Sequence, residues 1–343
     1  MLRQHHPDES NARPGIRQPA SVPGLPAPAA AAYLKTAGFL LLLHGGLSIL
    51  LRLVLDKIPV FSDLFSGNTL RSFVLSGTLT QLVLVLLPTV IMLMVVRPPA
   101  SDLVGGRAKA GSLILATTVG IPAAVVFQGL NNLLIFALAR AGIRINIPMS
   151  SSSFSFSGDL LLSQPWTVWL VVLLLAVVLP GLTEELMFRG LLQGALRSGC
   201  RPAAAIIWQA LAFAVFHADP LFLLPPFLAG ALLGYIRHKS ESLLPSVLAH
   251  MTLNFSLLAI RPLLPHLTSQ YISSSASQAQ SLLYASLIAA FVAAVAFIPL
   301  LVLIGHRQPD DQFQSGSGRR WLPGWIFFAA LLLLTGGLYL QSI

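Results

Sequence analysis

The chain has 343 residues, of which 55% are hydrophobic and only 10% are charged, with a formal net charge of +9. Because soluble domains carry about 25% charged residues, this composition excludes an ordinary water-soluble protein and predicts an all-α, polytopic membrane protein. The positive charge does not indicate a nucleic-acid partner, since the Lys and Arg residues lie singly or in small groups between apolar runs. Cys200 is the only cysteine, which excludes an intramolecular disulfide framework and a cysteine-rich zinc site.

Residues 1–32 are predicted to form a disordered cytoplasmic tail. Six prolines lie among Ala, Gly and charged residues in this segment, and such a composition cannot bury a core. The segment is too polar for a signal peptide, so the apolar run that follows it is predicted to be a retained membrane span.

Nine apolar runs follow, and each is predicted to be a transmembrane helix. The runs are 36–55, 73–96, 112–139, 166–197, 202–217, 221–236, 243–260, 282–304 and 321–340. A spanning helix needs about 17–25 residues, so the third and fourth runs are long enough to be tilted or kinked, with Pro122 and Pro180 as kink positions. The chain after the tail is predicted to consist of N-terminal helices at 33–145, a Ser-rich loop at 146–165, a central catalytic core at 166–260 and C-terminal helices at 261–343.

The distribution of basic residues predicts a cytoplasmic N-terminus. With this orientation, fourteen of the 21 Lys and Arg residues lie in inside segments and six in outside segments, in agreement with the positive-inside rule. Two polar connections, 147–165 and 261–281, then lie outside. We interpret them as flexible loops, with a substrate gate as the alternative.

Two adjacent carboxylates, Glu184 and Glu185, fall well inside an apolar run. Ionisable groups within a bilayer cost several kcal/mol, so they are functional candidates. Glu185 and Arg189 have the i,i+4 spacing of a helical ion pair. This pairing leaves Glu184 without a partner on its own helix, and a lone buried carboxylate suits proton transfer. The alternative is a structural Glu–Arg clamp.

Two further polar motifs lie in later spans: Phe213 precedes His217 by four residues, and His250 precedes Asn254 by four, which puts each pair on one helix face. The alternatives are a packed core histidine and an interhelical hydrogen bond.

Helix lengths place these motifs in one layer of the membrane. Glu184 lies ~20 Å of helix from the basic turn at 197–201, and His217 lies ~24 Å beyond that turn. Asn254 follows Lys239 by a comparable length of chain. Three helices therefore present polar groups at a similar depth.

This set of residues has two chemical interpretations. A carboxylate and an imidazole can deprotonate a water, while a carboxamide and a second imidazole stabilise an oxyanion, which suits hydrolysis of an amide. Alternatively, Glu184, His217 and His250 supply three ligands for a catalytic Zn²⁺. The sequence leaves both open.

The ordered motifs resemble the CPBP family of intramembrane proteases, which includes CAAX prenyl endopeptidases and bacteriocin-processing or abortive-infection proteins. The family pattern is EExxxR, FxxxH and HxxxN, and the resemblance covers about 166–260. The matching residues are Glu184, Glu185, Arg189, Phe213, His217, His250 and Asn254.

The resemblance implies an intramembrane endopeptidase in which Glu184 and His217 activate a water, while His250 and Asn254 stabilise the oxyanion. The ion pair of the first motif would hold the fold. The implied partners are membrane lipid and a membrane-associated peptide or protein substrate. The Leu- and Ala-rich composition favours a bacterial cytoplasmic membrane. The rival functions are a proton-coupled transporter that uses Glu184 and His217 as a relay, and a non-catalytic scaffold or immunity protein.

Overall fold

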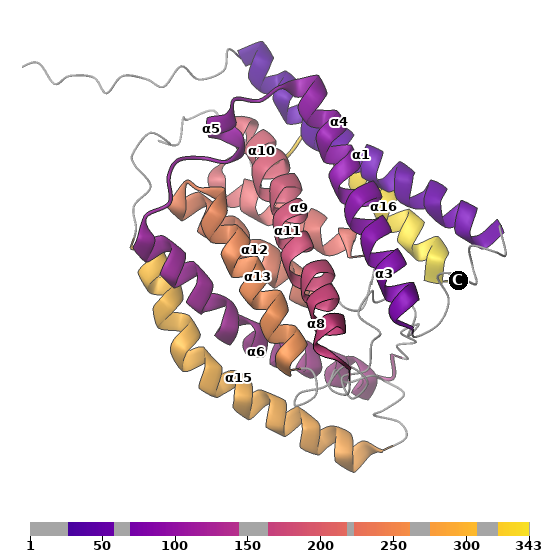
Figure 1. Ribbon diagram of the computed structural model, residues 1–343, viewed down its shortest axis with the longest axis vertical. Helices are drawn as coiled ribbons and strands as arrows, with labels where there is room; N and C mark the ends of the chain where they lie inside the picture. The colour runs from indigo at the N-terminus through magenta and orange to yellow at the C-terminus, as the bar shows by residue number, and fades with distance from the viewer. Residues whose placement is uncertain are drawn as a thin grey trace, which may run out of the picture.

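The computed structural model describes residues 27–57, 69–143, 164–217, 223–260, 275–306 and 322–342. Within these ranges every regular element is a helix, so the all-α prediction is confirmed for this part of the chain (Figure 1). The N-terminal part of the predicted tail, most of the Ser-rich loop and the connection at 261–274 lie outside the described residues.

A helix occupies each of the nine predicted runs. The elements are α1 (Ala27–Lys57), α3 (Leu70–Leu79), η1 (Thr80–Leu86), α4 (Leu87–Val96), α5 (Ala100–Leu103), α6 (Ala110–Arg140), α8 (Trp166–Leu173), η2 (Leu174–Val178), α9 (Leu179–Glu185), η3 (Leu186–Leu192), α10 (Gln193–Gly199), α11 (Pro202–Phe216), α12 (Leu224–Ser240), α13 (Leu243–Ile260), α15 (Ala276–Gly305) and α16 (Trp325–Ser342). The segments labelled η are π-helical.

Six helices of the described chain are long and apolar enough to cross a membrane. They are Leu34–Leu51 within α1, Leu70–Val96, Ala110–Arg140, Trp166–Gly199, Leu243–Ile260 and Ala276–Gly305. α11 is apolar but has 15 residues, about 22 Å of helix, whereas the hydrocarbon core is about 30 Å thick. The chain is therefore a multi-pass integral membrane protein. Of the nine predicted spans, six are confirmed as described helices of sufficient length and hydropathy.

The N-terminal helix begins earlier than the sequence predicted. α1 starts at Ala27, inside the segment 1–32 that was assigned to the disordered tail. Alanine is the strongest helix former, and residues 29–32 are a run of four alanines, so the helix extends back through them.

Two π-helical segments end just before a proline. Pro88 follows η1 and Pro180 follows η2, each at the second residue of the next α-helix. Proline lacks the N–H that the regular α-helical pattern requires, and a shift to a wider turn accommodates the missing donor. Pro122, by contrast, lies inside an uninterrupted α6.

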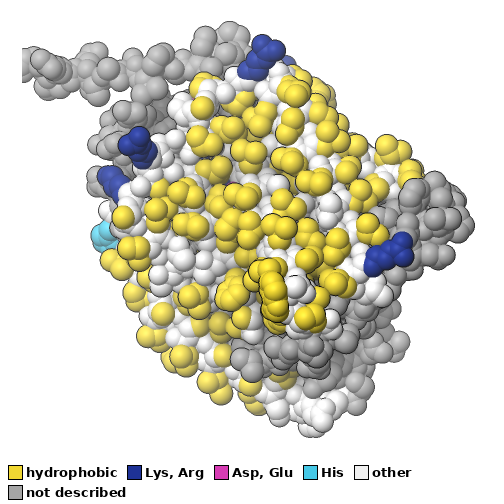
Figure 2. Space-filling model, viewed as in Figure 1, with side chains coloured by type: hydrophobic (Ala, Val, Ile, Leu, Met, Phe, Trp, Pro, Cys, Tyr) yellow, Lys and Arg dark blue, Asp and Glu magenta, His cyan; other side chains and the backbone are white. Residues whose placement is uncertain are grey.

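The bundle is held together by close helix contacts. α6 packs against α13 on one side and α15 on the other, and α1 packs against α16 (Figure 1). A methyl group added at Gly120 of α6 would lie 2.8 Å from the carbonyl oxygen of Ala249 on α13, so glycine permits this approach. Figure 2 shows one face of the molecule on which hydrophobic side chains predominate among the described residues. Phe291 of α15 is 75% exposed, as expected for a side chain that faces lipid.

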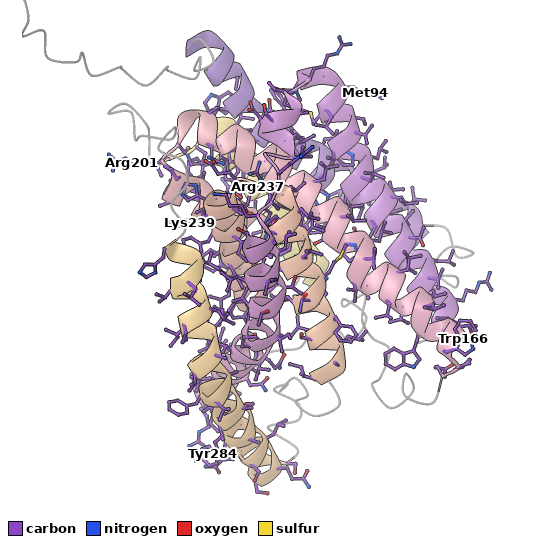
Figure 3. The ribbon with its side chains drawn as sticks, turned by 60° about the vertical axis from the view of Figure 1, so that its left-hand side comes forward. Met94, Trp166, Arg201, Arg237, Lys239 and Tyr284 are labelled. Carbon is purple, nitrogen blue, oxygen red and sulfur yellow. The ribbon has the colours of Figure 1, made fainter. Side chains whose placement is uncertain are left out.

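Three basic residues and two aromatic residues lie towards opposite ends of the bundle. Figure 3 shows Arg201, Arg237 and Lys239 towards one end, and Trp166 and Tyr284 towards the other. The first three are residues that the charge distribution assigns to the cytoplasmic side. The cytoplasmic position of the N-terminus stays a prediction.

The connection between α4 and α6 is fastened to the turn between α12 and α13. The amide of Leu243 donates to the carbonyl of Val104 at 2.8 Å, and the amide of Gly106 donates to the carbonyl of Glu241 at 3.0 Å. Gly105 has a φ of 75°, a conformation that favours glycine. This connection also packs Leu103 against Gly190, and so holds η3 in place at the basic end of the bundle.

Candidate active site

The first motif forms a buried ion pair that connects three helices. Arg189 Nη1 lies 2.7 Å from Glu185 Oε1, and both side chains are fully buried. Arg189 also donates to the carbonyl of Gly230 on α12 at 3.3 Å, and its guanidinium carbon lies 4.5 Å from the centre of the Phe213 ring on α11. The pair therefore joins the Glu-bearing helix to α11 and α12.

His250 of α13 lies between the two glutamates. Its Nδ1 is 2.9 Å from Glu185 Oε1, and its Nε2 is 3.9 Å from Glu184 Oε2. Because a carboxylate only accepts hydrogen bonds, Nδ1 carries the proton of the shorter contact. His250 thus links α13 to α9 and directs its second nitrogen at Glu184.

Glu184 is held by one oxygen. Its Oε1 accepts a hydrogen bond of 2.8 Å from Nε2 of Gln81 on η1, and the hydroxyl of Thr183 donates to Oε1 of the same glutamine. Its Oε2 is buried and has no hydrogen-bond partner within the described part of the chain. The side chain therefore has one fixed oxygen and one oxygen available to a reactant.

His217 caps the C-terminal end of α11 with an exposed side chain. Its Nδ1 lies 2.8 Å from the carbonyl of Phe213 and donates to it, since a carbonyl can only accept. In the neutral ring the lone pair is then on Nε2. The ring packs edge-on against Phe213 at 4.6 Å and interacts electrostatically with Glu184.

Asn254 lies one helical turn beyond His250. Its Nδ2 donates to the carbonyl of Ala176 in η2 at 3.2 Å, and the side chain is half-buried. A primary amide carries two N–H groups, so one remains for a second acceptor. The contact fixes the amide beside the Glu-bearing helix.

The three motifs therefore meet. Arg189 contacts Phe213 on α11 and Gly230 on α12. Both glutamates lie beside His250 on α13, and the rings of Phe213 and His250 lie 5.8 Å apart.

Residues 165–256 match the family model described as type II CAAX prenyl endopeptidase Rce1-like. This region is Rce1-like. The match contains all three motifs, and it confirms the resemblance to CPBP intramembrane proteases and supports a hydrolase of the CAAX protease type. No curated protein and no solved structure matches the chain.

Gln81 lies outside the Rce1-like region and was missed by the sequence analysis, as was the contribution of Thr183. The available signal was that Gln81 is the one carboxamide in the apolar run 73–96, and polar groups in membrane helices bond across helices. Its partner, on a helix about a hundred residues later, could not be inferred from spacing within a helix.

The described residues give no support to the zinc alternative. A zinc site would need Glu184, His217 and His250 to converge on one point at about 2.0–2.2 Å. Across the ranges that the structure describes, no group of three His, Cys, Asp or Glu side chains is arranged to hold a metal ion. Nδ1 of His217 and Nδ1 of His250 are each engaged with protein acceptors, so only the Nε2 atoms of the two rings could be ligands.

Proposed function

We propose that the protein is an intramembrane endopeptidase that hydrolyses a peptide bond of a membrane-associated protein or peptide with a water activated by Glu184. The observation that carries the proposal is the asymmetric environment of the Glu184 carboxylate. Its Oε1 is hydrogen bonded to Gln81, whereas its buried Oε2 has no hydrogen-bond partner among the described residues and faces the imidazole of His250.

The attack step uses Glu184 and His217. Glu184 Oε2 accepts a proton from the water, and the water oxygen forms a bond to the carbonyl carbon of the substrate. Nε2 of His217 is a second acceptor that can orient the same water, because Nδ1 donates to Phe213. The proton held by the glutamate then passes to the leaving amine as the C–N bond breaks.

The oxyanion is stabilised by the remaining two polar side chains. Asn254 has one N–H that is not used by Ala176, and Nε2 of His250 is a second donor when it carries a proton. The carboxylate of Glu185, 2.9 Å from Nδ1 of His250, holds the ring in place through its other nitrogen. All of these steps are carried by side chains of the protein.

The substrate we propose enters from the membrane. The Rce1-like match favours a prenylated protein with a C-terminal CAAX sequence. In a bacterial membrane, the corresponding substrates would be a peptide leader, a bacteriocin precursor or a segment of a membrane protein. In both cases the apolar part of the substrate would lie among lipid while its peptide bond reaches Glu184.

Purified protein in detergent, incubated with an internally quenched farnesylated CAAX peptide and with unprenylated membrane peptides, tests the proposal. We expect Glu184→Gln, which preserves shape and removes the base, to lower kcat by about 10²–10⁴-fold. Asp102→Asn makes the same chemical change at an exposed position of α5 and should cleave like wild type. Undiminished cleavage by Glu184→Gln would overturn the assignment.

A further inference from the structure

Gln81 reaches the proposed base from a separate helix. The glutamine is 6% exposed, and its Nε2 donates to Oε1 of Glu184, which is 4% exposed, at 2.8 Å. Hydrogen bonds to ionised acceptors are about twice as strong as neutral ones, and burial excludes water as a substitute donor. The contact therefore restrains the rotation of the carboxylate.

Thr183 contacts the other end of the Gln81 amide. The hydroxyl of Thr183 is within hydrogen-bonding distance of two acceptors, Oε1 of Gln81 and the carbonyl of Leu179. The carboxylate of Glu184 only accepts, so the amide nitrogen of Gln81 faces it and the amide oxygen faces Thr183. Threonine and glutamate are adjacent on α9, and the glutamine closes a loop between them. The direction of donation runs from Thr183 to Gln81 to Glu184.

The helical segment that carries Gln81 is itself held from two directions. Gln81 lies in η1, and the π-helical turn changes the direction of side chains relative to a regular α-helix. His44 on α1 contacts the carbonyl of Leu84 in this turn through Nδ1 at 2.8 Å. The His44 ring also lies 4.4 Å from the ring of Phe216, the neighbour of His217. The π-helical turn therefore contacts Glu184 through Gln81 and the His217 end of α11 through His44.

We propose that Gln81 is a positioning residue for the peptidase reaction. It holds Oε1 of Glu184 so that Oε2 is the oxygen directed at His250 and at the reacting water. This inference rests on the proposed function, because it assigns the proton-accepting atom of the same glutamate. It adds a residue from outside the Rce1-like region, and Thr183 acts through that residue.

Gln81→Leu is the direct test, because leucine has similar volume and no donor. With the farnesylated CAAX peptide, we expect kcat to fall by about 10–100-fold, the range of a lost charged hydrogen bond, and KM to change by less than about threefold. Thr89→Val is the matched control: Thr89 is buried in the same membrane span, and within the described part of the chain its hydroxyl bonds the Val85 carbonyl of its own helix. It should retain wild-type kcat. Wild-type kcat in folded Gln81→Leu would overturn the inference.

Thr183→Val provides a second variant that leaves Gln81 in place. We expect a smaller fall in kcat, about 3–10-fold, and no further fall when Thr183→Val is added to Gln81→Leu. Residues that act through one contact show such non-additivity, whereas independent structural damage would multiply. A multiplicative double variant would contradict the order of donation.

An infrared difference spectrum gives a readout that is independent of cleavage. At low pH, the carboxyl C=O band of Glu184 is identified by its loss in Glu184→Gln. In Gln81→Leu we expect this band at higher wavenumber, because the donor to Oε1 is gone, and we expect it unchanged in Thr89→Val. An unshifted band would overturn the inference even if kcat fell.

These readouts separate the two proposals. A shifted band together with undiminished cleavage by Glu184→Gln means that the contact exists and that the peptidase assignment of Glu184 is wrong. Loss of cleavage in Glu184→Gln, with wild-type kcat and an unshifted band in Gln81→Leu, overturns the role of Gln81 alone.

Discussion

Arg189 shows how much of the site depends on a single buried cation. Its guanidinium contacts a carboxylate on its own helix, a backbone carbonyl on α12 and an aromatic face on α11. The i,i+4 spacing to Glu185 was visible in the sequence because both residues lie on one helix. The contacts with Gly230 and Phe213 depend on how separate helices pack, and spacing along one helix carries no such information.

Glu185→Gln should destabilise the protein by about 3–5 kcal/mol, because it leaves the buried guanidinium without its carboxylate partner. Combining it with Arg189→Met removes the unpaired charge, so the double variant should be more stable than Glu185→Gln alone. Denaturation in detergent measures the free energy of unfolding of the single and the double variant. A double variant that is less stable than Glu185→Gln would contradict a charge-pairing role.

At the scale of helices, apolar runs and their polar boundaries predicted most elements. α13 has the predicted bounds because the polar turn at Ser240–Ser242 precedes it and the apolar run ends at Ile260. The π-helical segments were not predicted, since the residues of η1 are the same apolar types that form the α-helices around it. Of the two prolines that were predicted to be kink positions, Pro180 follows η2, whereas Pro122 lies inside an uninterrupted α6.

Gly120→Ala should separate α6 from α13. The added methyl would lie 2.8 Å from the Ala249 carbonyl oxygen and 2.9 Å from the Leu253 amide nitrogen, and backbone atoms cannot rotate away. We expect a loss of about 1–3 kcal/mol in stability, together with reduced cleavage because Ala249 precedes His250.

Gly46→Ala is the control for that substitution. Gly46 is also helical, but no atom lies within 4 Å of the position of an added methyl. Its melting temperature should equal or slightly exceed that of the wild type, since alanine favours helix by up to about 1 kcal/mol. Equal losses in the two variants would indicate a general intolerance of α-helical glycine substitution, not a close approach of α6 and α13.

For the whole molecule, the charge distribution and the arrangement of the helices lead to one prediction about orientation. Arg201 and Trp166 are both exposed and lie at opposite ends of the bundle (Figure 3). With the N-terminus in the cytoplasm, the basic end that contains Arg201 faces the cytoplasm and the end that contains Trp166 faces outside.

Single cysteines test this orientation in a Cys200→Ala background, which contains no other cysteine. A membrane-impermeant maleimide added to intact cells should label Trp166→Cys and leave Arg201→Cys unlabelled until the membrane is opened. The unsubstituted background reports non-specific labelling. The reverse pattern would place the N-terminus outside.

Because Gln81 lies on a helix outside residues 165–256, the matched segment does not contain the complete site. The matched segment, with all its motif residues unchanged, could be joined to a different set of N-terminal helices. The graft would still lack the amide that bonds Glu184. The site therefore needs more of the chain than the segment that carries the three motifs. The N-terminal span that contains Gln81 could not be replaced by another helix of similar hydropathy without loss of this contact.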